Sequence, residues 1–299
     1  MITVDPVAEA EAPIAERRGR VSVHAAWRNP GVLFGLGVLA LVILAAVLAP
    51  YLWTGDPILI KPRFRLRAPS GAAWLGTDQF GRDVYSRVLH GARVSLFIGF
   101  AVATIAVAVG LAIGLVAGYL RILDAVVMRI MDGIMAIPSI LLAIAMVTLS
   151  GAGVVTVIVA ITIPEIPRVA RLVRSVVLTV REEPYVEAAI GVGTPLPILL
   201  VRHILPNTLA PLIVQGTYVC AAAILTEAIL SFLGAGIPTE VPSWGNIMAE
   251  GRQSFQIAPW VILFPGLCVA VTVLAINILG DGLRDTLDPR IAKSVGGFR

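Results

Sequence analysis

The chain has few charged residues, and this alone indicates which class of protein it belongs to. Asp, Glu, Lys and Arg make up 14% of the 299 residues, whereas hydrophobic residues make up 58%. Soluble domains carry about 25% charged residues, so this composition suits lipid as the surrounding solvent. The formal charge is only +4, and no basic patch is interleaved with aromatic residues. We therefore expect no nucleic-acid partner, and basic residues that lie at lipid headgroups.

Residues that carry chemistry are also scarce. The two cysteines, Cys220 and Cys268, both lie in apolar stretches, which excludes a disulfide framework and a CxxC motif. The three histidines lie far apart, without the spacing of metal ligands. Neither lysine, Lys61 or Lys293, belongs to a GxxxxGK[ST] phosphate loop, and HExxH and GxSxG are absent. The sequence therefore predicts no catalytic, cofactor or metal site on this chain.

Long uncharged runs are abundant, and they predict an all-α, polytopic membrane protein with six transmembrane helices. Each helix needs about 20 mostly apolar residues to cross a bilayer. One run of 32 uncharged residues, Gly133–Pro164, is too long for one span, and Ser150–Gly153 has the composition of a turn. The expected spans are 31–55, 94–120, from about 125 to this turn, from the turn to about 170, 203–234 and 253–280.

The distribution of Lys and Arg predicts the orientation. With both termini in the cytoplasm, the cytoplasmic pieces carry 15 of these residues and the outer pieces carry 8, in agreement with the positive-inside rule. The expected organisation is a cytoplasmic tail at 1–30, a six-helix domain at 31–290 and a cytoplasmic tail at 291–299. Within the domain we expect an outer loop at 54–93 and a cytoplasmic loop at 181–207.

The outer loop is expected to have structure of its own. Residues 61–67 alternate basic and other side chains, which suggests an extended stretch. Residues 82–89 read as a short amphipathic helix that Gly91 ends, with Asp83 and Arg87 as an ion pair at i, i+4. This helix could lie at the lipid interface or contact a docking partner.

The cytoplasmic loop is predicted to form a helix–Gly–helix hairpin. Pro184 suits the first turn of a helix, and Gly193 can adopt the left-handed conformation that ends one. Thr194 can cap the next helix, and Pro195 suits its first position. One apolar face is expected at i, i+3, i+4, i+7, comprising Tyr185, Ala188, Ala189 and Val192. This face could fit a groove in another protein or cover the ends of the spans, and the residue pattern leaves both open.

A family resemblance favours the first alternative. Glu187-Ala188-Ala189, then Gly193, then HILP at 203–206 resemble the EAA loop of ATP-binding-cassette (ABC) import permeases. His203 stands where the general pattern has an aliphatic residue, but HILPN is typical of the dipeptide/oligopeptide importer branch. Further stretches resemble that branch: LGTD at 75–78, GRD at 81–83, GARVSL at 91–96, PSWG at 242–245 and GDGLRDTLDPR at 280–290. The resemblance is strongest to the second, C-type permease.

The resemblance implies the type I ABC importer transmembrane-domain fold and a place in the bacterial inner membrane. It also implies a sister permease as heterodimer partner, two ATP-binding subunits that hold ATP and Mg²⁺, an external substrate-binding protein and membrane lipid as partners. In this family the EAA loop forms a coupling helix that sits in a cleft of the ATPase subunit. The ATPase-coupling residues implied here are Tyr185, Glu187, Ala188, Ala189, Gly193, His203, Leu205 and Pro206.

Charged residues inside the spans need an explanation, because a charge at the bilayer centre costs about 2.5 kcal/mol or more. Glu227 could face the solute path or join helices, and we expect the interhelix role. Asp132 is expected to pair with Arg129, three residues before it. A stripe at three-residue spacing is expected at lipid headgroups, with contact to an ATPase subunit as the alternative: Arg168, Arg171 and Arg174.

Other functions stay open at this point. A permease of the same family for nickel, glutathione or another small solute would have the same features. An ATP-independent channel or secondary transporter would predict inverted repeats or an acidic relay in the spans, and neither is visible. A membrane-embedded enzyme would need a catalytic constellation that the sequence lacks.

Overall fold

The computed structural model describes residue 27 and residues 29–287. Regular structure in this part of the chain is helical, apart from two isolated bridges. The tail expected at 291–299, most of that at 1–30 and the end of the 280–290 motif lie outside these residues. The elements are α2 (Pro30–Leu48), η1 (Ala49–Tyr51), η2 (Pro62–Phe64), α3 (Val84–Tyr119), α4 (Arg121–Met135), α5 (Ser139–Ser150), α6 (Val154–Val180), α7 (Pro184–Gly191), α8 (Leu196–Leu199), η3 (Leu200–Ile204), α9 (Leu205–Phe232), α10 (Trp244–Gly251), η4 (Arg252–Ser254) and α11 (Trp260–Leu287).

Several of these helices can cross a membrane. In the described part of the chain, four segments are long and apolar enough alone: Pro30–Tyr51, Val84–Tyr119, Leu196–Phe232 and Trp260–Leu287. The pair α4 and α5 meets the same criterion only together, and it is bent by 84° at the break that holds Pro138. α6 has 27 residues but carries one glutamate and three arginines, which lower its hydropathy. The expectation of six spans is compatible with this arrangement.

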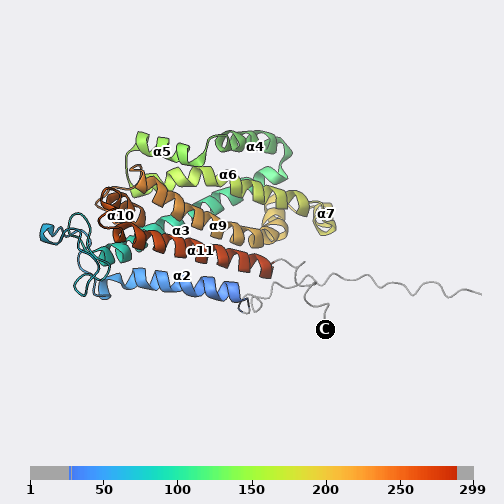
Figure 1. Ribbon diagram of the computed structural model, residues 1–299. Helices are drawn as coiled ribbons and strands as arrows, with labels where there is room; N and C mark the ends of the chain where they lie inside the picture. The colour runs from blue at the N-terminus through green and yellow to red at the C-terminus, as the bar shows by residue number, and fades with distance from the viewer. Residues whose placement is uncertain (1–26, 28, 288–299) are drawn as a thin grey trace, which may run out of the picture.

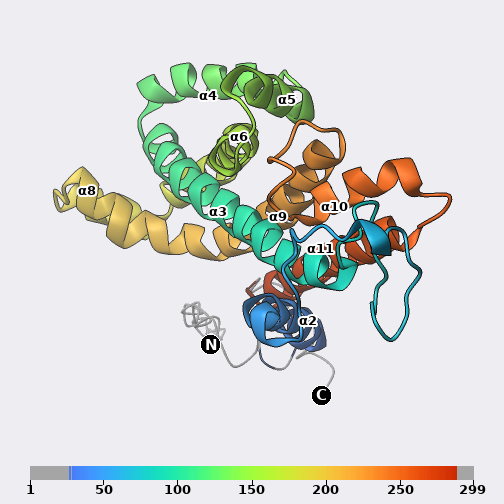
Figure 2. The same cartoon turned by 90° about the vertical axis from the view of Figure 1, so that its left-hand side faces the viewer.

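The helices run between two ends of an elongated bundle (Figures 1 and 2). At one end, here called the loop end, residues 52–83 connect α2 to α3 beside α10. At the opposite end, here called the hairpin end, α7 and α8 project from the bundle. The predicted outer loop and the predicted cytoplasmic hairpin therefore lie at opposite ends of the molecule.

α3 is the central helix, in contact with α6, α9 and α2. Three glycines spaced by four residues form one face of α3, and a Cβ on any of them would lie 2.6–2.8 Å from a valine Cβ of α6. The pairs are Gly110 with Val169, Gly114 with Val173 and Gly118 with Val177. In lipid the hydrophobic effect contributes little to the association of helices. Small residues instead let two helix backbones approach closely, and the resulting van der Waals contacts stabilise the pair.

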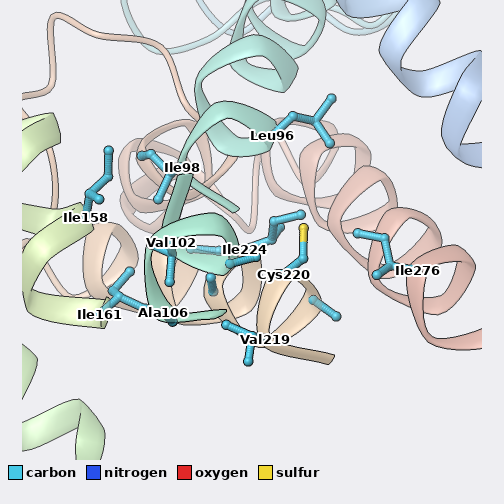
Figure 3. Packing of buried hydrophobic residues seen from close by; sticks show 14 of the residues in the cluster. Leu96, Ile98, Val102, Ala106, Ile158, Ile161, Val219, Cys220, Ile224 and Ile276 are labelled. Carbon is cyan, nitrogen blue, oxygen red and sulfur yellow. The ribbon is translucent and has the colours of Figure 1, made fainter. Parts of the chain in front are cut away.

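The buried core lies around α3 (Figure 3). Ile98, Val102 and Ala106 of α3 lie toward Ile158 and Ile161 of α6. Val219, Cys220 and Ile224 of α9 pack on the same helix, with Ile276 of α11 beyond them.

The loop end differs from the prediction. Residues 62–64 form a 3₁₀ turn, so the stretch 61–67 is not extended throughout. α3 begins at Val84 and continues through Gly91 for 36 residues, so no separate short helix exists. Gly91 instead allows close packing, since a Cβ there would lie 3.2 Å from the carbonyl carbon of Ser243.

Candidate functional site

The hairpin begins with α7, which starts at Pro184 and ends in a glycine turn. Gly193 has φ +83°, a conformation that glycine adopts without steric cost. The amide of Thr194 donates to the carbonyl oxygen of Ala189 at 3.0 Å, and that of Gly193 to Ile190 at 2.9 Å. These two bonds form a Schellman motif, so the predicted stop at Gly193 has the expected local cause.

The hairpin exposes apolar side chains: of the predicted face, Ala188 and Val192 are exposed, whereas Tyr185 and Ala189 are half-buried. Val186, absent from the predicted face, is fully buried, while Val192 is 88% exposed at the tip. The other exposed apolar side chains of the hairpin are Ile190, Ile198 and Val201. The carboxylate of Glu187 is exposed and has no hydrogen-bond or ion-pair partner among the described residues. The tip is therefore an apolar surface, and the exposed carboxylate of Glu187 lies on α7 beside it.

The second arm returns to the bundle without a break. Pro195 occupies the N-cap position and Leu196 begins α8, so Thr194 is not the cap that the sequence suggested. Residues 200–204 form a π-helical turn that passes directly into α9. π-turns are rare and are frequent at functional sites. The second helix of the predicted hairpin is therefore the beginning of a spanning helix.

The two arms of the hairpin contact each other through Tyr185 of the first arm and His203 and Asn207 of the second. The rings of Tyr185 and His203 lie 6.5 Å apart. Nδ2 of Asn207 donates to Oη of Tyr185 at 3.1 Å and to the carbonyl oxygen of His203 at 2.8 Å. Leu205 is half-buried and Pro206 is exposed in the first turn of α9. Sequence reasoning did not single out Asn207, although it follows the HILP motif directly.

Ion pairs hold α6, which leads into the hairpin, against α4. Nη2 of Arg174 lies 2.6 Å from Oδ2 of Asp124, and Arg171 pairs with Asp132. Arg168 pairs with Glu165 on its own helix at 2.6 Å. The expected Asp132–Arg129 pair is therefore wrong.

The three arginines of the stripe also form ion pairs that the sequence did not predict, and their expected place at lipid headgroups stays a prediction. α4 and α6 bring these charges together across 39 and 50 residues of sequence, which spacing along one helix cannot show. Each arginine of the stripe meets a carboxylate of this chain.

Glu227 lies fully buried near the loop end of α9. Its Oε1 accepts hydrogen bonds from the hydroxyls of Ser231 and Ser243, both at 2.9 Å. Its Oε2 accepts from the hydroxyl of Ser95 at 3.1 Å. The carboxyl group thus joins α3, α9 and the residue before α10, and it contacts no solvent.

A second buried polar cluster ties the loop end together. Oδ2 of Asp78 lies 2.7 Å from both Nε of Arg82 and Nη1 of Arg87. Nη1 of Arg87 also lies 2.5 Å from Oε2 of Glu250, which Arg82 contacts as well. Asp83 does not pair with Arg87 as expected; it caps α3 by accepting from the amide of Ser86 at 2.8 Å. Glu250 on α10 was not predicted, because 163 residues separate it from Arg87.

Comparison with known proteins identifies the family of this fold. Residues 110–293 match the family described as the binding-protein-dependent transport system inner membrane component. Residues 23–69 match the N-terminal transmembrane domain of oligopeptide transport permease C. The chain belongs to this family of ABC transporter permeases, which are membrane subunits of transport systems.

Relatives extend over nearly the whole chain. A probable peptide ABC transporter permease protein of Sinorhizobium fredii is 57% identical over 90% of this chain and 92% of its own length. The dipeptide transport system permease protein DppC of Alkalihalophilus pseudofirmus is 44% identical over 88% and 87%. The glutathione transport system permease protein GsiD of Pectobacterium atrosepticum is 41% identical over 90% and 93%.

Proposed function

We propose that this chain is one permease subunit of an ATP-driven importer of di- and oligopeptides, and that its hairpin couples it to an ATPase. It forms half of the transmembrane path with a sister permease, and a substrate-binding protein delivers peptide from outside. The relatives named for peptide and dipeptide transport support the substrate class. The glutathione permease relative makes glutathione, itself a short peptide, the second candidate.

The observation that carries the coupling role is the exposed tip at residues 190–198. A contiguous patch of exposed apolar side chains on a protein surface commonly marks a site where a partner binds. An apolar helix that projects from a bundle fits a groove in another protein. ATP binding would move the groove, and the hairpin and the spans would follow through differential contacts in the two states.

Substitution of Gly193 tests this proposal. A Cβ at Gly193 meets no atom within 4 Å, so Gly193→Asp acts through the positive φ and the added charge. We expect the variant to insert in the membrane, to lose co-purification with the ATPase subunits and to lose ATP-dependent peptide uptake. Gly151→Asp is the matched control, because Gly151 lies outside the hairpin, has a positive φ of +86° and is equally unobstructed.

Glu187→Lys gives an independent test at the tip, with Glu240→Lys at the loop end as its control. We expect only Glu187→Lys to weaken binding to the ATPase subunits. Normal uptake by both Gly193→Asp and Glu187→Lys would contradict the coupling role.

A further inference from the structure

A cavity of about 600 Å³ opens at the hairpin end between α6, α9 and α11. It extends from the first turn of α9 to the last residue of α11. Its polar lining comes from Asn207, Gln215 and Tyr218 of α9 and from Arg284 of α11. The volume falls within the range of about 300–1,000 Å³ that holds small ligands.

Two cavities lie on different faces of α9, and the residues that line them differ in polarity. Residues 207, 215 and 218 lie on the polar face, whereas Leu209, Leu212 and Ile213 face a second cavity of about 530 Å³. The lining of that second cavity is apolar except for two threonines and a glycine backbone. Polar side chains on a spanning helix face protein or a water-filled cavity, because lipid leaves them without partners. Of these two cavities, the one lined by Asn207, Gln215, Tyr218 and Arg284 is therefore the better suited to hold water.

Arg284 is the one cationic side chain among the residues that line the cavity, and it lies within hydrogen-bonding reach of Tyr218. Arg284 forms no ion pair with any carboxylate among residues 27 and 29–287. Oη of Tyr218 donates a hydrogen bond to the carboxylate of Asp281, so Arg284, Tyr218 and Asp281 lie together at this end of the cavity. A guanidinium group presents paired donors that match the two oxygens of a carboxylate.

We propose that this cavity is the cytoplasm-facing part of the solute path, and that Arg284 receives the terminal carboxylate of a short peptide there. The inward opening and the peptide class rest on the proposed function. Asn207 lies at the rim and bonds to Tyr185 of α7, so the cavity and the hairpin share a residue. Asn207 is thus a positioning residue between coupling and transport.

Cysteine labelling tests whether the cavity holds water. The full complex is used, with Cys220 and Cys268 of this chain replaced by alanine. Single cysteines Gln215→Cys and Leu209→Cys are exposed to a membrane-impermeant maleimide in inside-out vesicles. We expect Gln215→Cys to react about 100-fold faster, because the reactive thiolate forms in water and not in lipid. Equal rates would overturn the assignment of the cavity to the path.

Protection by peptide tests Arg284. Trialanine added from the cytoplasmic side is expected to slow the labelling of Gln215→Cys about tenfold near saturation, since only the free site reacts. Trialanine amide, which lacks the carboxylate, should not protect. Arg284→Gln should abolish protection, whereas Arg121→Gln, an exposed arginine in the first turn of α4, should keep it.

Equal protection by the acid and the amide, or unchanged protection in Arg284→Gln, would overturn the role of Arg284. ATP-driven uptake by the unsubstituted complex is measured in parallel. If uptake of peptide is absent while the cavity still labels and is protected, the proposed function fails and the cavity assignment stands.

Discussion

Glu227 shows how a single carboxyl group can hold three parts of a membrane protein together. It lies among three serine hydroxyls from α3, α9 and the start of α10. A polar group buried in lipid surroundings is tolerated only when it has partners, and here the partners are all on this chain. Full burial separates Glu227 from the polar cavity at the hairpin end, where solute contact is proposed.

Glu227→Leu is expected to destabilise the detergent-solubilised protein by about 1–3 kcal/mol or more, because buried hydroxyls lose their acceptor. Glu227→Gln keeps one oxygen acceptor and should cost less. Thermal unfolding followed by intrinsic fluorescence measures both. If Glu227→Gln keeps full stability but abolishes peptide uptake, the carboxylate acts in the path and the interhelix role is wrong.

At the scale of elements, the α3–α6 contact depends on the absence of side chains. The glycines at 110, 114 and 118 bring the backbone of α3 against valines of α6. α6 continues to the hairpin, so this contact fixes the position from which α7 projects. The ion pairs between α4 and α6 hold α6 from its other side.

Gly114→Leu should break this contact, since even its Cβ would lie 2.6 Å from Cβ of Val173 and 2.7 Å from the carbonyl oxygen of Ala170. Overpacking costs about 1–3 kcal/mol. Gly133→Ala on α4, where nothing lies within 4 Å, should instead add about 0.5–1 kcal/mol through helix propensity. Thermal unfolding measures the stability of both variants. If Gly114→Leu is as stable as the unsubstituted protein, α3 and α6 can move apart without an energetic cost.

Elements were largely predictable from the sequence, and their contacts were not. The turn at 150–153 was predicted correctly, as was the hairpin turn at Gly193. The single span expected from about 125 to this turn is instead divided into α4 and α5, which are bent by 84°. The end of a helix at Gly91 was wrong, because local composition does not show that Ser243 packs there. Partners of Arg171, Arg174 and Glu227 come from distant segments, so pairing rules along one helix miss them.

At the scale of the whole molecule, the two ends of the bundle differ: buried ion pairs join the segments of the loop end, whereas apolar side chains are exposed at the hairpin end. Asp78, Arg82, Arg87 and Glu250 form a buried network of two acids and two bases that joins the outer loop to α10. The hairpin end instead presents an exposed apolar tip. A loop end held by ion pairs and an exposed hairpin end suit the proposed subunit, which an ATPase would move from its hairpin end.

Arg87→Met should release the outer loop, because Asp78 and Glu250 would keep only one of two cations. Removal of one partner from a buried ion pair costs about 3–5 kcal/mol. Trypsin applied to the loop end should cleave the variant faster after Arg63, which is exposed and is followed by Phe64. Arg65→Met, at another exposed arginine, is the control. Unchanged cleavage of Arg87→Met would show that the network does not hold the loop.

The π-helical turn at residues 200–204 has a consequence for insertions and deletions. Such a turn accommodates one more residue than an α-helical turn, and each residue of an α-helix advances the rotation by about 100°. Deletion of one residue from this turn would restore regular α-helix and swing α7 around the axis of α9 by roughly a quarter of a revolution. The tip would then point away from its present direction while every side chain on α9 kept its lipid or protein neighbours. The five residues of this turn therefore set the direction in which α7 projects relative to α9.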